Sequence, residues 1–338
     1  MQQTKQETST TPTRDWLRVL AQYREPSHIR SFVELGITGV SFIVLWGAAW
    51  WALSVSYWLT LAITIPAAAF LVRLFLIQHD SGHGAFFRRR FLNDWLGRAI
   101  GILTFTPYDV WRHSHAVHHA TSGNLDKRGV GDIDTITVQE YQALPRTGRI
   151  VYRLYRNPMV MFGLGPAYHF LLRNRLPDVL GSTEWRPWVS AMGTNVGMAL
   201  IAGTAIYFLG AGPFLAVQLP IILLASSIGV WLFYVQHQFE DTYWATDKAW
   251  DLPEAALVGS SYYHLPGILS WVTANIGVHH VHHLSSRIPF YRLREVLRDH
   301  PELATRNRLT IWQSLACTRL RLWDESRKKL VSFSESRK

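Results

Sequence analysis

Cysteine is almost absent from this chain: its 338 residues include a single one, Cys317, against 15 histidines. One cysteine cannot form an internal disulfide, and it cannot supply the thiolate sets that hold iron–sulfur clusters or all-cysteine zinc sites. Any metal ion bound by this chain must therefore be held by nitrogen or oxygen ligands. The scarcity of cysteine is also typical of a protein that faces the cytosol.

Basic residues are missing from two long stretches, although the chain carries a formal net charge of +10. No lysine or arginine occurs in residues 31–72 or 187–247, and both stretches are strongly hydrophobic. Each contains two apolar runs that approach the ~20 residues needed to cross a ~30 Å hydrocarbon core. These runs are residues 37–53, 57–77, 189–209 and 213–235. They predict four transmembrane helices in two hairpins, and buried core helices of a soluble protein are the less favoured alternative.

The distribution of positive charge predicts the orientation of these hairpins. All 34 lysines and arginines lie in segments that flank the hairpins or, for Arg73, near the end of the second run. Because basic residues prefer the cytoplasmic side of a membrane, we expect both termini and the long middle segment to be cytosolic. Topology then accounts for the positive charge, and nucleic-acid binding is disfavoured.

Both ends of the chain are polar and lack the apolar core of a signal peptide. The stretches "MQQTKQETSTTPTRDW" and "SRKKLVSFSESRK" predict disordered or loosely held tails. The predicted organisation is an N-terminal cytosolic tail (1–30), a membrane domain (31–300) and a C-terminal cytosolic tail (301–338). Within the membrane domain, residues 78–188 and 236–300 form the expected cytosolic cap.

Nine histidines form one pair, two triplets and one single position, all on the predicted cytosolic side. They are, in chain order, His79, His83, His115, His118, His119, His237, His279, His282 and His283. The pair is spaced i, i+4 and both triplets are spaced i, i+3, i+4, so the members of each group share one face of a helix. The pair and the single position follow the second and fourth apolar runs, which hairpin geometry returns to the same side of the membrane.

Nine imidazole nitrogens are too many for one metal ion, and they suit two. Imidazole binds zinc, copper, nickel and iron, so the residue type alone does not name the ion. A catalytic zinc usually has three protein ligands and a water, so two zinc sites would not need nine histidines. Octahedral iron would accept eight or nine nitrogens shared over two centres and leave room for oxygen. The other six histidines are predicted to be surface or packing residues: His28, His113, His169, His264, His280 and His300.

The stretches H-D-S-G-H, H-A-V-H-H and H-H-V-H-H resemble the three histidine boxes of the membrane fatty acid desaturases. Further text, including "ATSGNLDKRGVGDIDTITVQEY" and "RLYRNPMVMFGLGPAYHFLL", is similar to the bacterial acyl-lipid branch with Δ12 and Δ5 enzymes. The resemblance covers roughly Ser31 to His300. Many relatives have cysteine where this chain has Ser81, and little effect on metal binding is expected because the position lies between ligands.

This resemblance implies an all-α integral membrane protein in a bacterial inner membrane, with four transmembrane helices in two hairpins and a cytosolic helical cap that holds a di-iron centre. The nine histidines above would be the ligands, with His237 as the additional one after the fourth span. The implied reaction is oxygen-dependent desaturation of a lipid-linked fatty acyl chain. A hydroxylase or ketolase with the same metals, and a non-catalytic zinc-binding membrane protein, stay open as alternatives.

Three further expectations concern the surroundings of the metals. Electrons would come from a separate acidic ferredoxin or flavodoxin docked on the basic runs "FFRRR" and "RKK", because the chain has no nucleotide-binding glycine turn and no set of cysteines for a cluster. Residues 91–103 form an apolar helical stripe that suits either the membrane interface or a buried cap helix. Candidates to line an acyl tunnel are Trp111, Tyr234 and Trp271, and candidates to bond a ligating histidine are Asp126, Asp132 and Asp134.

Overall fold

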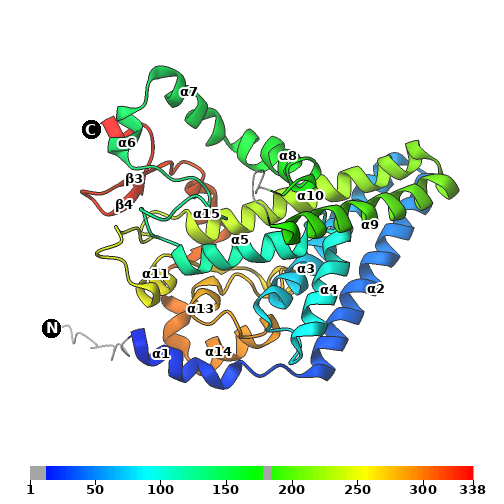
Figure 1. Ribbon diagram of the computed structural model, residues 1–338, viewed down its shortest axis with the longest axis horizontal. Helices are drawn as coiled ribbons and strands as arrows, with labels where there is room; N and C mark the ends of the chain where they lie inside the picture. The colour runs from blue at the N-terminus through cyan, green and yellow to red at the C-terminus, as the bar shows by residue number, and fades with distance from the viewer. Residues whose placement is uncertain (1–12, 178–183, 338) are drawn as a thin grey trace, which may run out of the picture.

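Two long helical hairpins form the framework of the protein (Figure 1). The computed structural model describes residues 13–177 and 184–337. Four of its helices are long and apolar enough to cross a membrane, namely α2 (His28–Ala52), α3 (Tyr57–His83), α9 (Trp185–Leu209) and α10 (Ala211–His237). The prediction of four spans in two hairpins is confirmed.

The second helix of each hairpin is longer than its apolar run. α3 continues past residue 77 to His83, and α10 continues past residue 235 to His237. The first histidine pair and the single histidine therefore lie on the last turns of the spans themselves. α2 also begins early, at His28, where the Ser27 side chain accepts a hydrogen bond from the Arg30 backbone N–H.

The remaining elements are short and form a cap at one end of the hairpins. Before α9 they are α1 (Thr13–Val19), η1 (Leu20–Tyr23), α4 (Arg90–Leu103), α5 (Tyr108–Thr121), α6 (Val138–Ala143), α7 (Arg146–Tyr155), η2 (Val160–Leu164), α8 (Gly165–Leu171) and η3 (Arg173–Arg175). After α10 they are α11 (Leu252–Val258), β1 (Tyr262–His264), α12 (Gly267–Val272), α13 (His279–Leu284), η4 (Phe290–Arg292), α14 (Leu293–Asp299), η5 (Pro301–Thr305), β2 (Arg308–Thr310), α15 (Ile311–Cys317), β3 (Leu322–Asp324), β4 (Lys329–Val331) and η6 (Glu335–Arg337). The strands form two small sheets, β1–β2 parallel and β3–β4 antiparallel. Each strand has only three residues, so the predicted all-α class holds.

The described parts of both chain ends are folded, contrary to the expectation of disordered or loosely held tails. Residues 1–12 and 338 lie outside the described residues. In α1, Trp16 is buried and its ring meets the edge of His300 with centroids 5.2 Å apart. At the other end, Trp323 and Leu330 of the β3–β4 hairpin are buried together. A few apolar side chains among the charges are enough to dock each end on the cap.

The apolar helix expected over residues 91–103 is α4, and it has one buried and one exposed face. One face packs against α3, with Asn93, Gly97 and Ile100 buried. A Cβ atom at Gly97 would lie only 2.1 Å from the Tyr108 ring, so glycine is required for this close approach. The opposite face leaves Phe91 and Trp95 exposed.

A buried ion pair connects the first hairpin to the loop before the third histidine box. The Arg73 guanidinium on α3 donates to Glu34 on α2 at 2.5 Å, and its Nε donates to Thr38 at 3.1 Å. It also donates to the backbone carbonyl of Trp271, and its charge lies 4.2 Å from the centre of the Trp271 ring. Because both charged groups are buried, Arg73 depends on Glu34 for its counter-charge. Glu34 also pairs with Arg30 at 2.8 Å.

Replacing Glu34 by glutamine should leave Arg73 buried without a counter-charge and lower the free energy of unfolding by about 3 kcal/mol. The double variant Glu34→Leu/Arg73→Leu removes both charges and should be more stable than Glu34→Gln. Thermal unfolding of the detergent-solubilised protein, followed by tryptophan fluorescence, measures the difference. Equal melting temperatures for the unmodified protein and both variants would show that the pair contributes no stability.

Candidate metal centre

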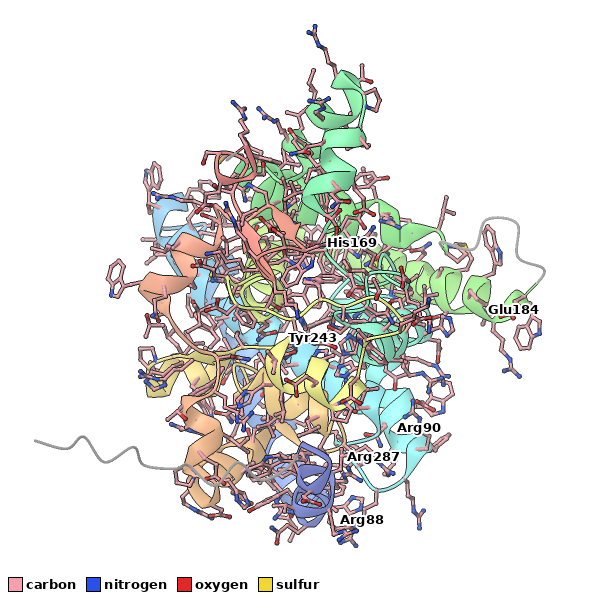
Figure 2. All side chains as sticks on the ribbon, turned by 90° about the vertical axis from the view of Figure 1, so that its left-hand side faces the viewer. Arg88, Arg90, His169, Glu184, Tyr243 and Arg287 are labelled. Carbon is pink, nitrogen blue, oxygen red and sulfur yellow. The ribbon has the colours of Figure 1, made fainter. Side chains whose placement is uncertain are left out.

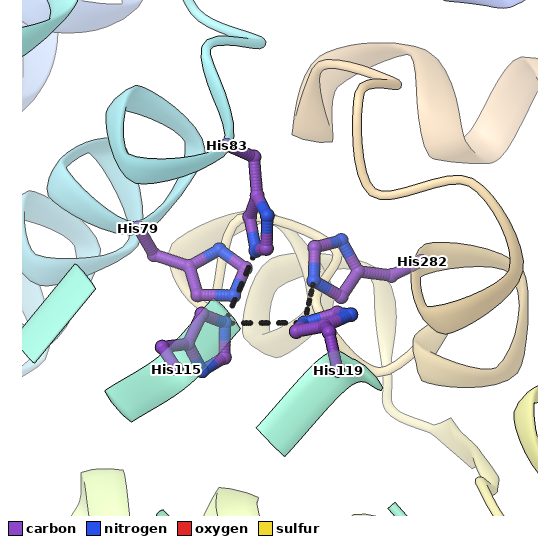
Figure 3. Close-up of side chains that lie close together, drawn as sticks. All are labelled: His79, His83, His115, His119 and His282. Carbon is purple, nitrogen blue, oxygen red and sulfur yellow. Dashed lines mark hydrogen bonds between the residues drawn. The ribbon is translucent and has the colours of Figure 1, made fainter. Parts of the chain in front are cut away.

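All nine predicted ligands converge at the cap end of the spans, where they form two adjoining groups. The first site consists of His79, His83, His115, His119 and His282 (Figure 3). The second site consists of His118, His237, His279 and His283. In each site one ring nitrogen per histidine lies within 4.8 Å of all the others, so each group could hold a metal ion.

Both triplets divide their members between the two sites. In α5, His115 and His119 belong to the first site, whereas His118 belongs to the second. In α13 the division is reversed, because His282 belongs to the first site and its two neighbours in the triplet belong to the second. Two residues spaced i, i+4 point the same way, and the residue at i+3 points to the adjoining site. Two short helices therefore fix the separation of the two sites.

Hydrogen bonding alone does not account for the arrangement of the ring nitrogens. In the first site, the Nε2 atoms of His83, His115, His119 and His282 follow one another at 3.1, 3.1 and 3.2 Å. A neutral imidazole nitrogen carries either a proton or a lone pair, so an Nε2 between two others cannot donate to one and accept from the other. A cation at the centre would satisfy all of these lone pairs at once.

The second site shows the same convergence in a more buried setting. The Nε2 atom of His237 lies 3.2 Å from that of His118 and 3.0 Å from that of His279. The Nε2 atom of His283 is buried and has no hydrogen-bond partner in the part of the chain that the structure describes. Four imidazoles that all face one another, one of them with an unpartnered nitrogen, fit a metal ion.

Burial disfavours the charged form of five histidines that the cap contributes to the two sites. It holds their pKa values well below the ordinary 6.5, and the neighbouring imidazoles lower these values further. The five are His115, His119, His279, His282 and His283. At neutral pH these rings keep a free lone pair, which is the form that binds a metal ion.

One of the three candidate aspartates bonds a histidine of the second site. The carboxylate of Asp132 lies 2.5 Å from Nδ1 of His118. This contact keeps the ring proton on Nδ1 and leaves Nε2 free to face the other histidines. Asp126 instead accepts a hydrogen bond from the backbone N–H of Asp247, and Asp134 is exposed.

Of the three aromatic candidates, Trp111 lies beside the first site and the other two have contacts elsewhere. The Trp111 ring stacks on His115 with centroids 4.7 Å apart. Tyr234 donates its hydroxyl to the carbonyls of Cys317 and Leu320, both at 3.1 Å. Trp271 lies against Arg73, as described above. The six histidines predicted to be surface or packing residues lie outside both groups.

Sequence reasoning missed Arg156, which is buried just behind the second site. Its guanidinium donates to Gln238 Oε1 at 2.7 Å and to the carbonyls of Asp134 and Leu320, both at 3.1 Å. Gln238 directly follows His237, and Asp134 lies two residues after the aspartate that bonds His118. One cation thus ties together the segments that supply two histidines of this site. Its position within "RLYRNP" is the one signal that the sequence offers. This signal is weak, because a sequence does not distinguish a buried arginine from a surface one.

The fold and the two sites define a helical protein with four helices that are long and apolar enough to cross a membrane and two adjoining histidine groups that could each hold a metal ion. The fatty acid desaturase family model matches residues 56–315. A "Fatty acid desaturase" of Bacillus subtilis is 47% identical over 314 residues, which are 93% of this chain and 89% of that protein. The chain belongs to the fatty acid desaturase family, as the histidine boxes indicate, and is an enzyme of the acyl-lipid desaturase type.

Two more distant relatives carry more specific names. A "sn-1 acyl-lipid omega-3 desaturase (ferredoxin)" of Synechocystis is 29% identical over 80% of this chain and 74% of that protein. A "sn-1 oleoyl-lipid 12-desaturase" of Anabaena variabilis is 25% identical over 75% of this chain and 72% of that protein. The similarity therefore extends over most of each chain.

Replacing Asp132 by alanine should weaken metal binding roughly 10- to 100-fold, because the His118 ring loses the acceptor that fixes its tautomer and orientation. Chelator competition followed by elemental analysis of the retained metal measures this affinity. The matched control is Asp134→Ala, which removes an exposed carboxylate from the same loop and should change little. Equal metal retention in the two variants would mean that the Asp132 contact does not support the site.

Replacing Arg156 by lysine keeps the charge but removes the forked donor geometry that links three segments. We expect the amount of bound metal per chain to fall, because the second site loses the support of two of its histidines. The control is Arg153→Lys, an exposed arginine in the last turn of α7, three residues before Arg156. A metal content that is unchanged in Arg156→Lys would contradict this role.

Proposed function

We propose that the protein is an oxygen-dependent desaturase of lipid-linked fatty acyl chains that uses two histidine-bound iron ions. The observation that carries this proposal is the pair of adjoining all-histidine groups at the ends of four membrane helices. Relatives named as acyl-lipid desaturases support a lipid-linked substrate. The nine histidines of the two sites are the proposed ligands.

The five histidines of the first site would hold one ion, and the four of the second site would hold the other. Two irons with dioxygen as co-substrate supply an oxidant strong enough to remove hydrogen from unactivated methylenes, which no side chain can do. The chain's contribution is to position the two ions and to surround them with buried side chains. Since α5 and α13 each supply both sites, they hold the two sets of nitrogens at a fixed separation. This arrangement suits a reaction at two adjacent carbon atoms.

Individual residues around the sites have proposed roles of their own. Asp132 holds the His118 proton on Nδ1, and Trp111 keeps the His115 ring from turning by stacking on it. All four histidines of the second site are buried, which limits the access of water. The side of the centre that faces the spans is proposed to receive the acyl chain from the bilayer.

We also propose that the cap and both termini face the cytosol of a bacterial cell and that electrons arrive from a separate carrier, either a ferredoxin or a flavodoxin. The name of the Synechocystis relative includes ferredoxin. The run Arg88–Arg90 is exposed and begins five residues after His83, the second histidine of the α3 pair. Figure 2 places Arg88, Arg90 and Arg287 toward one end of the same face of the cap. These cations would attract an acidic carrier close to the first site.

Expression in a bacterial host without double bonds at the tested positions should give new unsaturated chains in extracted phospholipids. Mass spectrometry then locates the double bond, and elemental analysis of the purified protein should find two irons per chain. His282→Ala should abolish the product because the first site loses a ligand. His113→Ala should retain it, because this exposed histidine belongs to neither group.

The same experiment separates the alternatives. An alcohol or ketone in place of a double bond would identify a hydroxylase or ketolase with the same metals. A protein that carries iron, receives electrons from an added ferredoxin and still leaves the lipids unchanged would refute the desaturase. Bound zinc is decisive only after reconstitution with iron, because histidine sites acquire the wrong metal on overexpression.

A further inference from the structure

Helix α7 has a packed face, a basic face and an apolar face, and the last two are exposed. Tyr152 and the end of the helix at Arg156 pack inward. Arg146, Arg149 and Arg153 follow the spacing i, i+3, i+7 and form a basic stripe beside this packed face. Next to the arginines lies an exposed apolar stripe of Ile150, Val151 and Leu154.

The apolar stripe is unusually exposed for residues of its type. Ile150 is 57% exposed, Val151 is 65% exposed and Leu154 is 58% exposed. Exposed apolar residues continue along the following segment, at Met159, Leu164, Tyr168 and Leu172. An apolar strip of this length, next to a basic one, is the pattern of a helix that lies at the surface of a bilayer.

The segment from η2 to α8 joins this strip to a membrane span. Phe162 of η2 packs against Trp231 and Tyr234 of α10 with ring centroids 5.0 and 5.1 Å apart. α8 also packs against α10. In Figure 1, α7 and α8 form an arm that extends to one side from α10. The exposed apolar strip is therefore continuous with the hairpin that enters the membrane.

A cleft of about 340 Å³ opens on the basic side of α7, between this helix and the chain's end. It is lined by eight residues, four of them arginines and none acidic. The arginines are Arg146, Arg149, Arg153 and Arg337. Two carboxylates next to lining residues in the sequence are bonded elsewhere, since Glu140 pairs with Arg128 and Glu335 accepts from Ser332. The positive charge of the cleft is thus left without a counter-charge from its lining.

The guanidinium groups differ in how firmly they are held. Arg153 donates to the Tyr141 hydroxyl at 2.6 Å, and Arg149 donates its Nε to the Leu144 carbonyl at 2.9 Å. Arg146 is exposed and has no bonded partner among the described residues. Two oriented cations and one free cation around an open cleft match an anionic group with several oxygen atoms, such as a phosphate.

We propose that the arm formed by α7, η2 and α8 lies in the membrane interface and that the arginine cleft binds the headgroup phosphate of an anionic phospholipid. The apolar stripe would enter the acyl region while the arginines beside it hold the phosphate. An acidic protein would match the arginines but not the apolar strip, so a lipid is the favoured occupant. This inference rests on the membrane hairpins and is independent of the metal chemistry.

Native mass spectrometry of the purified full-length protein, titrated with phosphatidylglycerol, phosphatidylcholine or inorganic phosphate, tests the cleft. The variant Arg146→Gln/Arg149→Gln should bind phosphatidylglycerol roughly ten-fold more weakly than the unmodified protein. The matched control Arg308→Gln/Arg319→Gln removes the same charge from two exposed arginines outside the cleft. It should bind as the unmodified protein does, and phosphatidylcholine binding should not change in either variant.

The single cysteine of the chain makes the position of the arm directly measurable. In a Cys317→Ala background, a spin label at Val151→Cys should be more accessible to dissolved oxygen than to a water-soluble nickel relaxant when the protein is in nanodiscs. A label at Glu325→Cys, in the exposed turn between β3 and β4, serves as the aqueous control. The two labels should give opposite preferences.

Four results would overturn the proposal. The first is equal phosphatidylglycerol binding by the cleft variant and its control, and the second is a Val151 label that prefers the nickel relaxant. The third is a loss of ferredoxin binding in the cleft variant with lipid binding unchanged, which would assign the arginines to a protein partner. Binding of inorganic phosphate as tight as that of the lipid would refute a lipid site, because the acyl chains would then contribute nothing.

Discussion

The structure depends on one constraint, which is that nine imidazoles face one another at the cap end of the spans, six of them buried. Their nitrogens approach to 3.0–3.2 Å in both sites, and the ring pKa values in the cap are depressed by burial. Without a cation, the lone pairs would repel each other. They would also lack the hydrogen bonds that exposed histidines form with water. The metal ions and the fold therefore support each other: the helices gather the ligands, and the ions compensate for the cost of gathering them.

The membrane hairpins supply the rigidity that such a site needs. α3 and α10 carry their histidines on the last turns of long helices, and the buried contact of Arg73 with Glu34 and with the Trp271 carbonyl joins the first hairpin to the segment that leads into α13. Arg156 does the same for the far side of the second site. Two buried arginines thus connect, through hydrogen bonds, parts of the chain that are distant in sequence.

Much of this architecture follows from local patterns in the sequence. Apolar runs without basic residues predict the spans, and the i, i+3, i+4 spacing predicts which histidines share a helical face. Hydropathy did not predict where α3 and α10 end, because their last residues are polar and are stabilised by the cap. Only the i, i+4 spacing of His79 and His83 indicated a helix there. The division of each triplet between two sites was also hidden, since it depends on how α5 and α13 face each other. The folded chain ends were missed because their few apolar residues, such as Trp16 and Trp323, are buried only by partners far along the chain.

The divided triplets of α5 and α13 have a consequence for how such a chain can change during evolution. Deleting or inserting one residue within either helix would rotate the following side chains by about 100° and would misdirect ligands of both sites together. The loops between the boxes carry no such restriction and can vary in length. Natural variation in length is therefore expected to be confined to these loops, while the two short helices keep a fixed number of residues between their outer histidines.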